Sequence, residues 1–312
     1  MTDMSQGYFY DASGQKVNID FMDSVARQTL VTVSNDITQI NSVIDGLENG
    51  ILTRADNAMR EDTEGRNLLE VFDSEIANGY ADPWEWLADR VSLHVYKGLQ
   101  PFDYIPETIG ADEIPMILGG FDLDAGCGDT EQPNGLFFHM GRTTRENVQW
   151  NTTNVNQGNA TNNAPWMVCN LKTWIDNTLL PKFPSTMRAH MGNRRNLLET
   201  RYAANSTLTD STNWAWNDLG RLWPLSEMEV YGCHQFSGVR SGAADTQWPI
   251  FKRTKDRIRR DADGARRYWG LLSVVAGSST TWCYVNSNGN ASHGNASYTG
   301  VAVAAGFKVV GD

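Results

Sequence analysis

Between positions 30 and 51, apolar residues recur at alternating spacings of three and four, and the residues between them are mainly Ser, Asn, Asp, Thr, Gln and Glu. This a/d heptad pattern predicts a helix with one narrow apolar seam. Isoleucine occupies both kinds of seam position, which favours three helices over two. We therefore expect a coiled-coil stalk that forms a homotrimer, with a seam of Leu30, Val33, Ile37, Ile40, Ile44, Leu47 and Ile51.

A second interpretation of this stretch stays open, namely one amphipathic helix that packs on its own domain. Gly46 weakens the helix by about 1 kcal/mol, and three heptads alone form a marginal coiled coil. The stalk would therefore need the following domain to hold the trimer together.

Helical patterning continues to residue 92 and then stops. The segment "RNLLEVFDSEIANG" ends at Gly79, and Asp82 followed by Pro83 is typical of a helix N-cap and first helical position. After residue 92, short apolar runs alternate with Gly, Asn, Asp and Pro clusters. The expected regions are an N-terminal attachment segment over 1–20, a helical and coiled-coil region over 21–92, and a compact α+β domain over 93–312.

Composition and charge narrow the function classes. The net charge of −11 argues against nucleic acid as a partner. The sequence has no signal peptide and no apolar run long enough to span a bilayer, so we expect no membrane insertion. A solvated turn or helix face is favoured over a phosphate site for a basic cluster that alternates with aspartates: Lys252, Arg253, Lys255, Arg257, Arg259 and Arg260.

Candidate metal and catalytic motifs are weak. The cysteines Cys127, Cys169, Cys233 and Cys283 form no CxxC pair, which argues against structural zinc and fits a reduced compartment. The five histidines form neither HxH nor HExxH, and no GxSxG or phosphate loop occurs. Asp122, Asp124 and Asp129 could hold Ca²⁺, but an acidic, Gly-rich turn is favoured because the terminal Glu of a calcium loop is missing. We expect no enzyme, no metal and no cofactor.

Four blocks in the second half of the chain carry a resemblance to a known family. They are "VCNLKTWIDNTLLPKFP" (168–184), "RLWPLSEMEVYG" (221–232), "RRYWGLLSVV" (266–275) and "WCYVNSNGNASHGNASYTGVAVAAGF" (282–307). In order and spacing they resemble the C-type-lectin-like domains of bacteriophage proteins, over roughly residues 95–310. The residues that match that family's motifs are Leu171, Trp174, Ile175, Asp176, Leu225, Ser226, Glu229, Trp269, Gly300, Val301 and Phe307.

Two departures from the family pattern concern local strand geometry. The family's Trp-Leu-Arg is Trp-Gly-Leu at 269–271, and the proline of the last motif is absent. The resemblance implies a C-type-lectin-like fold after the N-terminal helical segment.

A subset of these domains is the variable proteins of diversity-generating retroelements, in which miscopied adenines randomise Asn codons. Such codons yield Asn, Ser, Tyr, His, Thr, Gly and Asp, and segment 278–299 is built largely from these residues. Tyr, Ser, Gly and Asn are also the residues of adaptable binding surfaces. The alternative is an Asn/Gly-rich hairpin loop with no binding role.

The alternation of residues predicts which side chains would be displayed. Positions 284, 286, 288, 290 and 292 share one strand face, and a turn near His293–Gly294 would lead into a return strand through Ala296. Trp269, Trp282, Val301 and Phe307 are expected in the core. Tyr284 and Tyr298 would be the aromatic anchors of one ligand-binding patch formed by Tyr284, Asn286, Asn288, Asn290, Ser292, His293, Asn295, Ser297 and Tyr298.

These features together predict a receptor-binding protein at the tip of a phage tail fibre. The chain would be made in the host cytoplasm and reside in the virion, attached to other virion proteins through its N-terminus. Its partner would be a host cell-surface protein or glycan. The alternative is a structural virion component, such as a head decoration or baseplate protein, and a carbohydrate-active enzyme is a third class.

Overall fold

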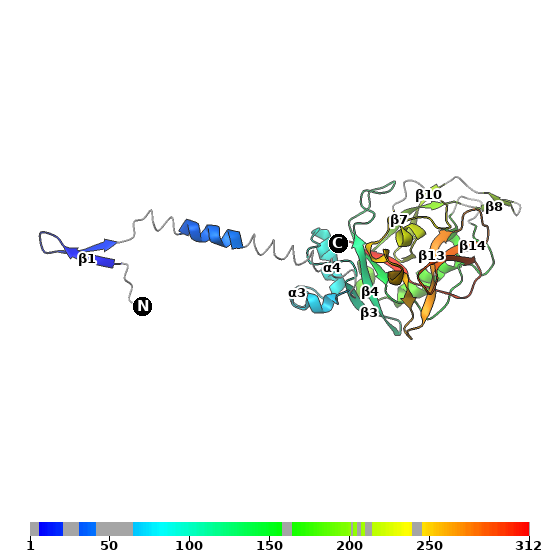
Figure 1. Cartoon of the computed structure of the whole chain (residues 1–312), viewed down its shortest axis with the longest axis horizontal. Helices are drawn as coiled ribbons and strands as arrows, with labels where there is room; N and C mark the ends of the chain where they lie inside the picture. Colours follow the sequence, from blue (N-terminus) through cyan, green and yellow to red (C-terminus); the bar gives the residue numbers. More distant parts are fainter. Residues whose placement is uncertain are drawn as a thin grey trace. The chain divides into compact units, whose positions relative to one another are not determined.

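The computed structural model describes residues 6–20, 31–41, 65–157, 164–200, 202–204, 207–209, 214–238 and 245–311 (Figure 1). The chain divides into two compact units, Met1–Thr63 and Glu64–Asp312. Each unit is described by itself below.

The first unit contains a β-hairpin and a helix. Strand β1 (Gln6–Tyr10) pairs antiparallel with β2 (Lys16–Asp20), and the Asp11 carboxylate closes the turn by accepting the amides of Ser13 and Gln15 at 2.9 Å each. Hydrogen bonds from Ser13 and Gln15 lower the pKa of Asp11.

A helix is present over 31–41, within the predicted seam. The seam residues Val33, Ile37 and Ile40 are 46%, 52% and 56% exposed. Their apolar side chains therefore lie on the surface of the single chain. The other seam residues, Leu30, Ile44, Leu47 and Ile51, lie outside the described residues.

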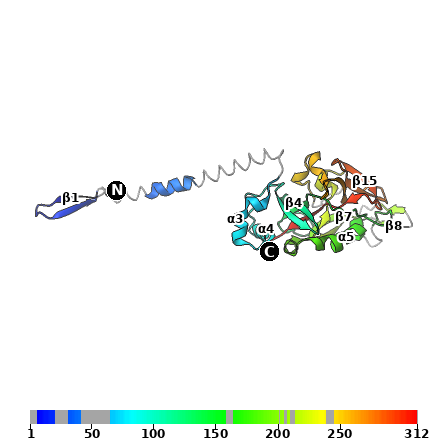
Figure 2. The same cartoon turned by 90° about the horizontal axis from the view of Figure 1, so that it is seen from below.

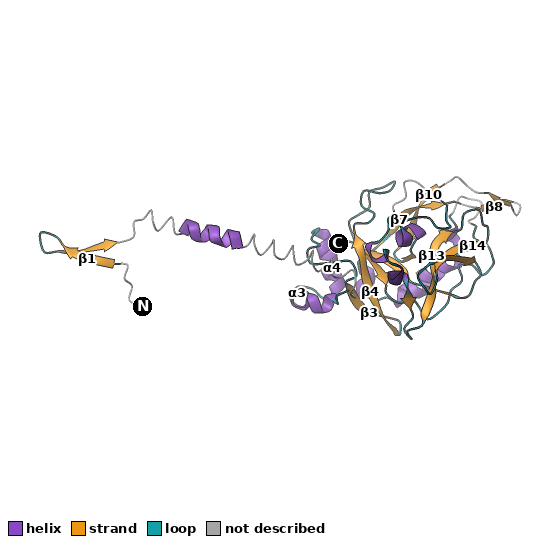
Figure 3. Cartoon of the chain, in the orientation of Figure 1, coloured by secondary structure: helices purple, strands orange, loops and turns teal. Residues whose placement is uncertain are grey.

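The second unit contains short helices distributed along the chain (Figure 3). The α-helices are α2 (Leu68–Val71), α3 (Asp73–Gly79), α4 (Pro83–Ser92), α5 (Asn170–Trp174), α6 (Ser185–Ala189) and α7 (Glu227–Tyr231). The 3-10 and π turns are η1 (Pro165–Val168), η2 (Ile175–Leu179), η3 (Leu180–Lys182), η4 (Pro249–Phe251) and η5 (Thr254–Arg257).

One larger sheet has the strand order β11-β17-β5-β4-β3, with β6 also paired to β17. Its paired strands are antiparallel. The strands are β3 (Tyr104–Ile109), β4 (Asp112–Phe121), β5 (Leu136–Met140), β6 (Met191–Gly192), β11 (Trp223–Pro224) and β17 (Ala305–Val309).

The second sheet has the order β12-β13-β14-β15, with β16 parallel to β13. Its strands are β12 (Arg259–Arg260), β13 (Arg266–Val274), β14 (Thr281–Val285), β15 (Ala291–Asn295) and β16 (Val301–Ala302). Two further pairs are β7 (Arg194–Glu199) with β10 (Trp214–Gly220), and β8 (Tyr202–Ala204) with β9 (Thr207–Thr209).

Helix α4 packs its apolar face on the larger sheet. The Asp82 carboxylate caps this helix by accepting the amides of Trp84 and Glu85 at 2.8 and 3.1 Å, as Asp82-Pro83 predicted. The Trp84 ring lies 5.4 Å from Phe138 and 5.7 Å from Phe307. Helix α4 therefore belongs to the core of the second unit.

The domain boundary differs from the expected one at residues 92 and 93. The compact unit begins at Glu64, so the helices over 68–92 are part of it and not of the stalk region. The reason is burial, because Leu68, Trp84 and Trp86 are fully buried in the same core as the strands. Composition changes near residue 92, but packing does not.

The content of 28% helix and 30% strand, with a curled antiparallel sheet, makes the chain an α+β protein as predicted. Trp269, Trp282, Val301 and Phe307 are all buried, as the sequence led us to expect. Within the described residues, no helix combines the length and apolar character needed to cross a membrane.

Candidate functional site

The polar ribbon of the sequence forms a β-hairpin at one end of the second unit. Strands β14 and β15 pair antiparallel, with Tyr284 opposite Ser292 and Cys283 opposite His293. Figures 1 and 2 agree that this hairpin lies at the end of the unit opposite to α3 and α4. Strand β15 is the edge strand, so its outer side is open.

The hairpin turn lies at residues 286–290, not near His293–Gly294 as predicted. Asn286 makes the turn, because its side-chain oxygen accepts the amides of Asn288 at 2.9 Å and Asn290 at 3.1 Å. Gly289 adopts a φ of 82°, a conformation that favours glycine. Since β14 ends at Val285, the strand alternation expected over 284–292 does not hold.

The turn is anchored to the segment before β12. The Arg257 guanidinium donates to the Gly289 carbonyl oxygen at 3.0 Å. A Cβ on Gly289 would lie 2.2 Å from the Thr254 carbonyl oxygen, so the two backbones pack directly against each other. Asn286 is thus a structural residue of the turn, whereas Asn288 and Asn290 are exposed on it.

Three tyrosines stack in a row beside this hairpin; we call Tyr268, Tyr284 and Tyr298 the tyrosine row. The ring centroids of Tyr268 and Tyr284 are 5.5 Å apart at 23°, and those of Tyr284 and Tyr298 are 6.4 Å apart at 29°. The buried Trp150 supports the middle ring at 6.5 Å. Stacked aromatic pairs contribute about 0.5–1.5 kcal/mol each beyond the area they bury, so the row is held in place.

Two tyrosines of the row, Tyr284 and Tyr298, lie over glycines. A Cβ on Gly294 would contact the rings of Tyr284 and Tyr298 at 3.2 and 3.6 Å, and one on Gly300 would lie 2.4 Å from the Tyr298 hydroxyl oxygen. Tyr298 is nevertheless 38% exposed. Partial burial, together with Tyr284 and Tyr268, raises its pKa, so the phenol stays neutral and can donate a hydrogen bond.

An open groove of about 450 Å³ borders the tyrosine row; we call it the tyrosine groove. It is lined by Tyr284, His293, Gly294, Asn295, Ser297, Tyr298 and Thr299. Five of the nine predicted ligand-binding residues therefore border one concave surface, although the ring of one of them, His293, lies on the other face of the hairpin.

The other four predicted residues do not line this groove. Ser292 lies opposite Tyr284 in the hairpin, and the three asparagines Asn286, Asn288 and Asn290 lie in the turn. The His293 side chain leaves the hairpin on the face of Cys283, and its ring meets Phe236 edge-on at 4.8 Å. The predicted single patch is thus divided between the groove, the turn and the opposite face.

The backbone beside the groove is fixed by bonds to distant segments. The amide of Ala296 donates to the Thr280 carbonyl oxygen at 2.7 Å, and the Ala296 carbonyl accepts the Asn151 amide at 3.0 Å. The Gln149 side chain donates to the Ser297 carbonyl oxygen at 2.5 Å. The groove is therefore a preformed surface on a rigid frame.

Tyr268 was not among the predicted site residues. It joins the row because β13 pairs with β14, with Gly270 opposite Tyr284, which puts Tyr268 on the same face. That pairing is non-local, and Tyr268 sits between Arg267 and Trp269 in a sequence that reads as core strand. Only its alternation with the buried Trp269 hinted that it faces the other way.

The acidic residues of segment 122–129 each contact a different basic side chain. Asp122 contacts His94 at 3.1 Å, and Asp129 contacts Arg195 at 2.6 Å. Asp124 is buried beside Lys308 at 2.8 Å. Among the described residues, no group of three or more His, Cys, Asp or Glu side chains is placed to hold a metal ion.

A buried ion cluster surrounds Asp124. Arg194 lies 3.6 Å from Asp124 and 3.0 Å from Glu229, and all of these side chains are at most 1% exposed. Burial lowers the pKa of Lys308, and Asp124 opposes that shift. Two cations balance two anions here, and the cluster ties β17 and α7 to β7, so we assign it a structural role.

A second polar group contains a serine, a histidine and a glutamate. The buried Glu227 accepts the amides of Gln235, Phe236 and Ser237 at 2.8–3.1 Å and the Ser237 hydroxyl at 2.7 Å. His234 Nδ1 lies 3.0 Å from that hydroxyl. Since the hydroxyl donates to Glu227 and not to the imidazole, the arrangement braces the loop and does not activate a nucleophile.

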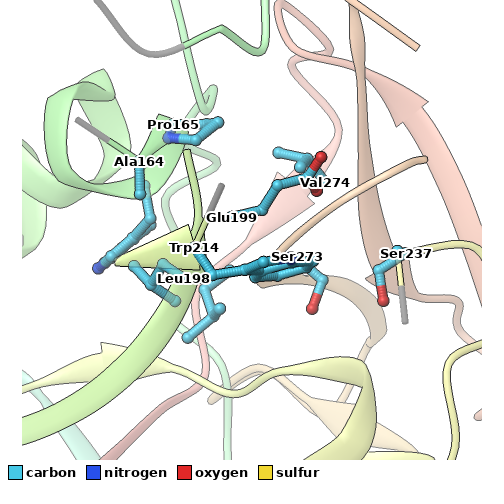
Figure 4. Close-up of a pocket in the computed structure, with 11 residues that line it drawn as sticks. Ala164, Pro165, Leu198, Glu199, Trp214, Ser237, Ser273 and Val274 are labelled. Atoms are coloured by element: carbon cyan, nitrogen blue, oxygen red, sulfur yellow. The ribbon is translucent and has the colours of Figure 1, made fainter. Parts of the chain in front are cut away.

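The cavity beside Ser237 is small. Figure 4 shows its lining residues, which include Glu199, Trp214, Ser237 and Ser273. The space open to water-sized molecules in it is about 30 Å³, which is enough for a few water molecules. It is too small to admit an organic substrate as it stands.

The chain was compared with known proteins. One family model, described as Domain of unknown function (DUF6273), matches residues 143–308, a span that contains the whole tyrosine row. No curated protein and no solved structure matches the chain.

Proposed function

Since this chain belongs to the DUF6273 family, a domain of unknown function, we propose a role for it on the basis of the geometry of the tyrosine groove. The second unit is a ligand-recognition domain. The observation that carries this proposal is a stacked row of three tyrosines bordering an open groove on a hydrogen-bonded frame. We further propose that the chain is a receptor-binding protein of a phage particle that binds a host-surface protein or glycan.

The chemistry of the groove suits recognition. Tyrosine offers a large amphipathic contact area and loses little side-chain entropy, and Asn295, Ser297 and Thr299 supply hydrogen-bonding groups at the rim. Partly exposed aromatics at the centre of a concave patch are the residues that usually dominate binding energy. Tyr284 and Tyr298 hold that position here.

The groove also lacks the features of a catalytic site. Its lining residues include one imidazole and no carboxylate, and the ring of that His293 packs against Phe236 on the other face of the hairpin. General acid–base or nucleophilic catalysis needs a second group within hydrogen-bond reach of the first. Binding without chemistry is therefore the function that this geometry favours.

The helix over 31–41 supports an oligomeric receptor-binding protein. Its exposed Val33, Ile37 and Ile40 follow the heptad spacing, and burial in a trimer would remove them from water. Three grooves on one particle would gain strength through multivalency. The C-type-lectin-like fold and the virion setting rest on the resemblance in sequence.

The test is binding of the labelled full-length chain to a panel of bacterial strains. On strains that bind the wild-type protein, Tyr284→Ala/Tyr298→Ala should bind at least about tenfold less, because it removes both anchors. Tyr298→Phe should bind nearly as well if stacking dominates. The matched control is Tyr10→Ala, which removes an exposed tyrosine from the first unit.

Light scattering and a melting curve establish that each variant keeps the oligomeric state and fold of the wild type. Equal binding by the folded double variant would overturn the tyrosine groove as the ligand site. Absence of binding to every strain in the panel would overturn the receptor role and favour a structural virion component.

A further inference from the structure

A second groove of the same unit is strongly basic. It encloses about 370 Å³ and is lined by four cationic side chains, Arg142, Lys255, Arg260 and Arg266, and no carboxylate is among its lining residues in the described part of the chain. Lys255, Arg260 and Arg266 are exposed. In a chain with a net charge of −11, such a concentration of positive charge is a local feature that needs an explanation.

The backbone brings the three arginines side by side. Arg260 lies directly opposite Arg266 in the antiparallel pair β12–β13. Arg142 forms an isolated parallel bridge with Arg260. Three adjacent segments therefore each present a guanidinium to the same groove, and like charges placed directly opposite each other destabilise a sheet.

The nearby acids are engaged elsewhere and do not relieve this repulsion. In the β12–β13 turn, Asp261 pairs with Arg267 at 2.7 Å, and Asp263 pairs with Arg145. Arg260 donates to the Gly264 carbonyl oxygen at 2.6 Å, a neutral acceptor. Among the described residues, the three guanidinium groups of Arg142, Arg260 and Arg266 thus have no carboxylate within ion-pair distance.

Arg142, like Arg260, has a neutral backbone carbonyl oxygen as its hydrogen-bond partner. It donates to the Glu113 carbonyl oxygen at 2.9 Å, and neither Arg142 nor Arg266 has a carboxylate within ion-pair distance in the described part of the chain. A sequence that keeps several like charges together, at a loss of stability, is typical of a functional surface.

We propose that this basic groove binds a phosphate group carried by a small, sugar-sized ligand. Guanidinium groups bind phosphate oxygens through paired hydrogen bonds, and a phosphate monoester carries up to about two negative charges, which would offset part of the charge of these cations. The volume suits a small ligand. The acidity of the whole chain disfavours a long polyanion such as DNA, which would be repelled beyond the groove.

The sequence pattern alone pointed away from this groove. The basic run 252–260 reads as a solvated face, and only Lys255 and Arg260 of that run line the groove. Arg142 and Arg266 come from other parts of the chain. The proposal is independent of the tyrosine groove, because the two lining sets share no residue.

The experiment compares the full chain with two variants of equal charge. Arg260→Gln/Arg266→Gln removes the central pair of the groove, and Lys252→Gln/Arg221→Gln removes two exposed cations that do not line it. Binding of inorganic pyrophosphate and glucose 6-phosphate is measured by calorimetry and by the melting temperature at low salt. Glucose, an acidic peptide and a DNA duplex are the comparison ligands.

Both phosphate probes should raise the melting temperature of the wild type and of the control variant by several degrees. Arg260→Gln/Arg266→Gln should bind them at least about tenfold more weakly. Without ligand, this variant should melt at or above the wild-type temperature, because the cross-strand repulsion is gone. Phosphate binding that is equal in both variants overturns the proposal, as does tighter binding of the DNA duplex or of the acidic peptide.

The same affinities distinguish a phosphate on a sugar from a free phosphate. Stronger binding of glucose 6-phosphate than of pyrophosphate supports a phosphorylated sugar of a surface glycan, and the reverse order supports a free small phosphate. Equal binding of glucose and glucose 6-phosphate would show that the phosphate is not recognised.

Discussion

Replacing Gly289 by alanine tests whether the hairpin that carries the tyrosine groove is positioned by its turn. The new Cβ would lie 2.2 Å from the Thr254 carbonyl oxygen and 3.3 Å from Ile258 Cγ1. The first distance is far below a normal contact, and the atom it meets belongs to the backbone. Either the turn or the 254–258 segment must shift, and the bond from Arg257 to the Gly289 carbonyl would be lost with it.

The loss of stability has two parts. A φ of 82° costs an alanine about 1–2 kcal/mol, and forcing an extra methyl into a packed site costs about 1–3 kcal/mol. Gly277 allows the backbone cost to be measured without the packing cost, because its φ is 68° but no atom lies within 4 Å of where its Cβ would be. Gly277→Ala should therefore lose only the first part.

The assay is thermal and denaturant unfolding of both variants and the wild type, followed by circular dichroism. Gly289→Ala should lose about 1–3 kcal/mol more than Gly277→Ala, or about 2–12 °C in melting temperature for a unit of this size. Equal losses in the two variants would refute the close packing of the turn on Thr254.

Three further expectations follow from other parts of the molecule. Asn286→Ala should lower the free energy of unfolding by about 1–2 kcal/mol, because two backbone amides lose their acceptor. Replacing the exposed Asn288 by alanine should change it by no more than about 0.5 kcal/mol. Equal tolerance of the two changes would contradict the structural role of Asn286. Light scattering should give about three chain masses, and Ile37→Asp/Ile40→Asp should dissociate the trimer; a wild-type monomer at micromolar concentration would refute the stalk. Burial, then the charge of Arg259, holds the pKa of His139 well below its ordinary 6.5, so the unfolded chain binds a proton that the native chain does not. The free energy of unfolding should therefore decrease as the pH falls below 6.5, and His139 should contribute up to about 1.4 kcal/mol per pH unit to that decrease. His139→Gln should flatten this slope, and an unchanged slope would show that other groups cause it.

Local signals in the sequence gave correct predictions where the stabilising contacts are local. The Asp82-Pro83 pair predicted the start of α4, and the Asp82 carboxylate caps that helix by accepting the amides of Trp84 and Glu85. Ser226 and Glu229 were recognised in the sequence only as family-motif residues, and the structure shows that they form a capping box: the Ser226 hydroxyl accepts the Glu229 amide at 3.1 Å, and the Glu229 carboxylate accepts the Ser226 amide at 2.8 Å. Buried aromatics such as Trp269 and Trp282 were recognisable because apolar residues of that size are placed in the core of a folded domain.

Features that depend on long-range pairing were not predictable from the pattern. The repeated Asn, Ser and Gly of segment 286–294 fit a turn at several places, and the register that selects 286–290 is fixed by Arg257 and Thr254, some thirty residues earlier. Tyr268 joins the tyrosine row, and Arg142 the basic groove, through strand pairing with distant segments. Neither residue differs in its sequence neighbourhood from an ordinary strand residue.

The structure sets a limit on how the hairpin could vary if a retroelement diversifies it. Asn286 is part of the diversifiable alphabet, yet its Oδ1 holds the turn at 2.9 and 3.1 Å. Among the residues that a miscopied Asn codon yields, Asp keeps an equivalent acceptor, Ser and Thr offer a hydroxyl oxygen that makes the same turn more weakly, and Tyr, His and Gly have no acceptor in that position. We therefore expect copies of this gene to carry mainly Asn or Asp at position 286, with Ser or Thr as weaker replacements, and not Tyr, His or Gly.

Positions 288, 290 and 295 are exposed, and the frame beside them is held by backbone bonds of Ala296 and Ser297 that no side-chain change at those positions removes. These positions should vary across the full alphabet. If the gene does lie beside such a template repeat, sequencing both in related genomes tests this expectation. Tyr or His at position 286 in folded, infectious variants would refute the structural role of Asn286, and an invariant 288–295 would refute diversification of the hairpin.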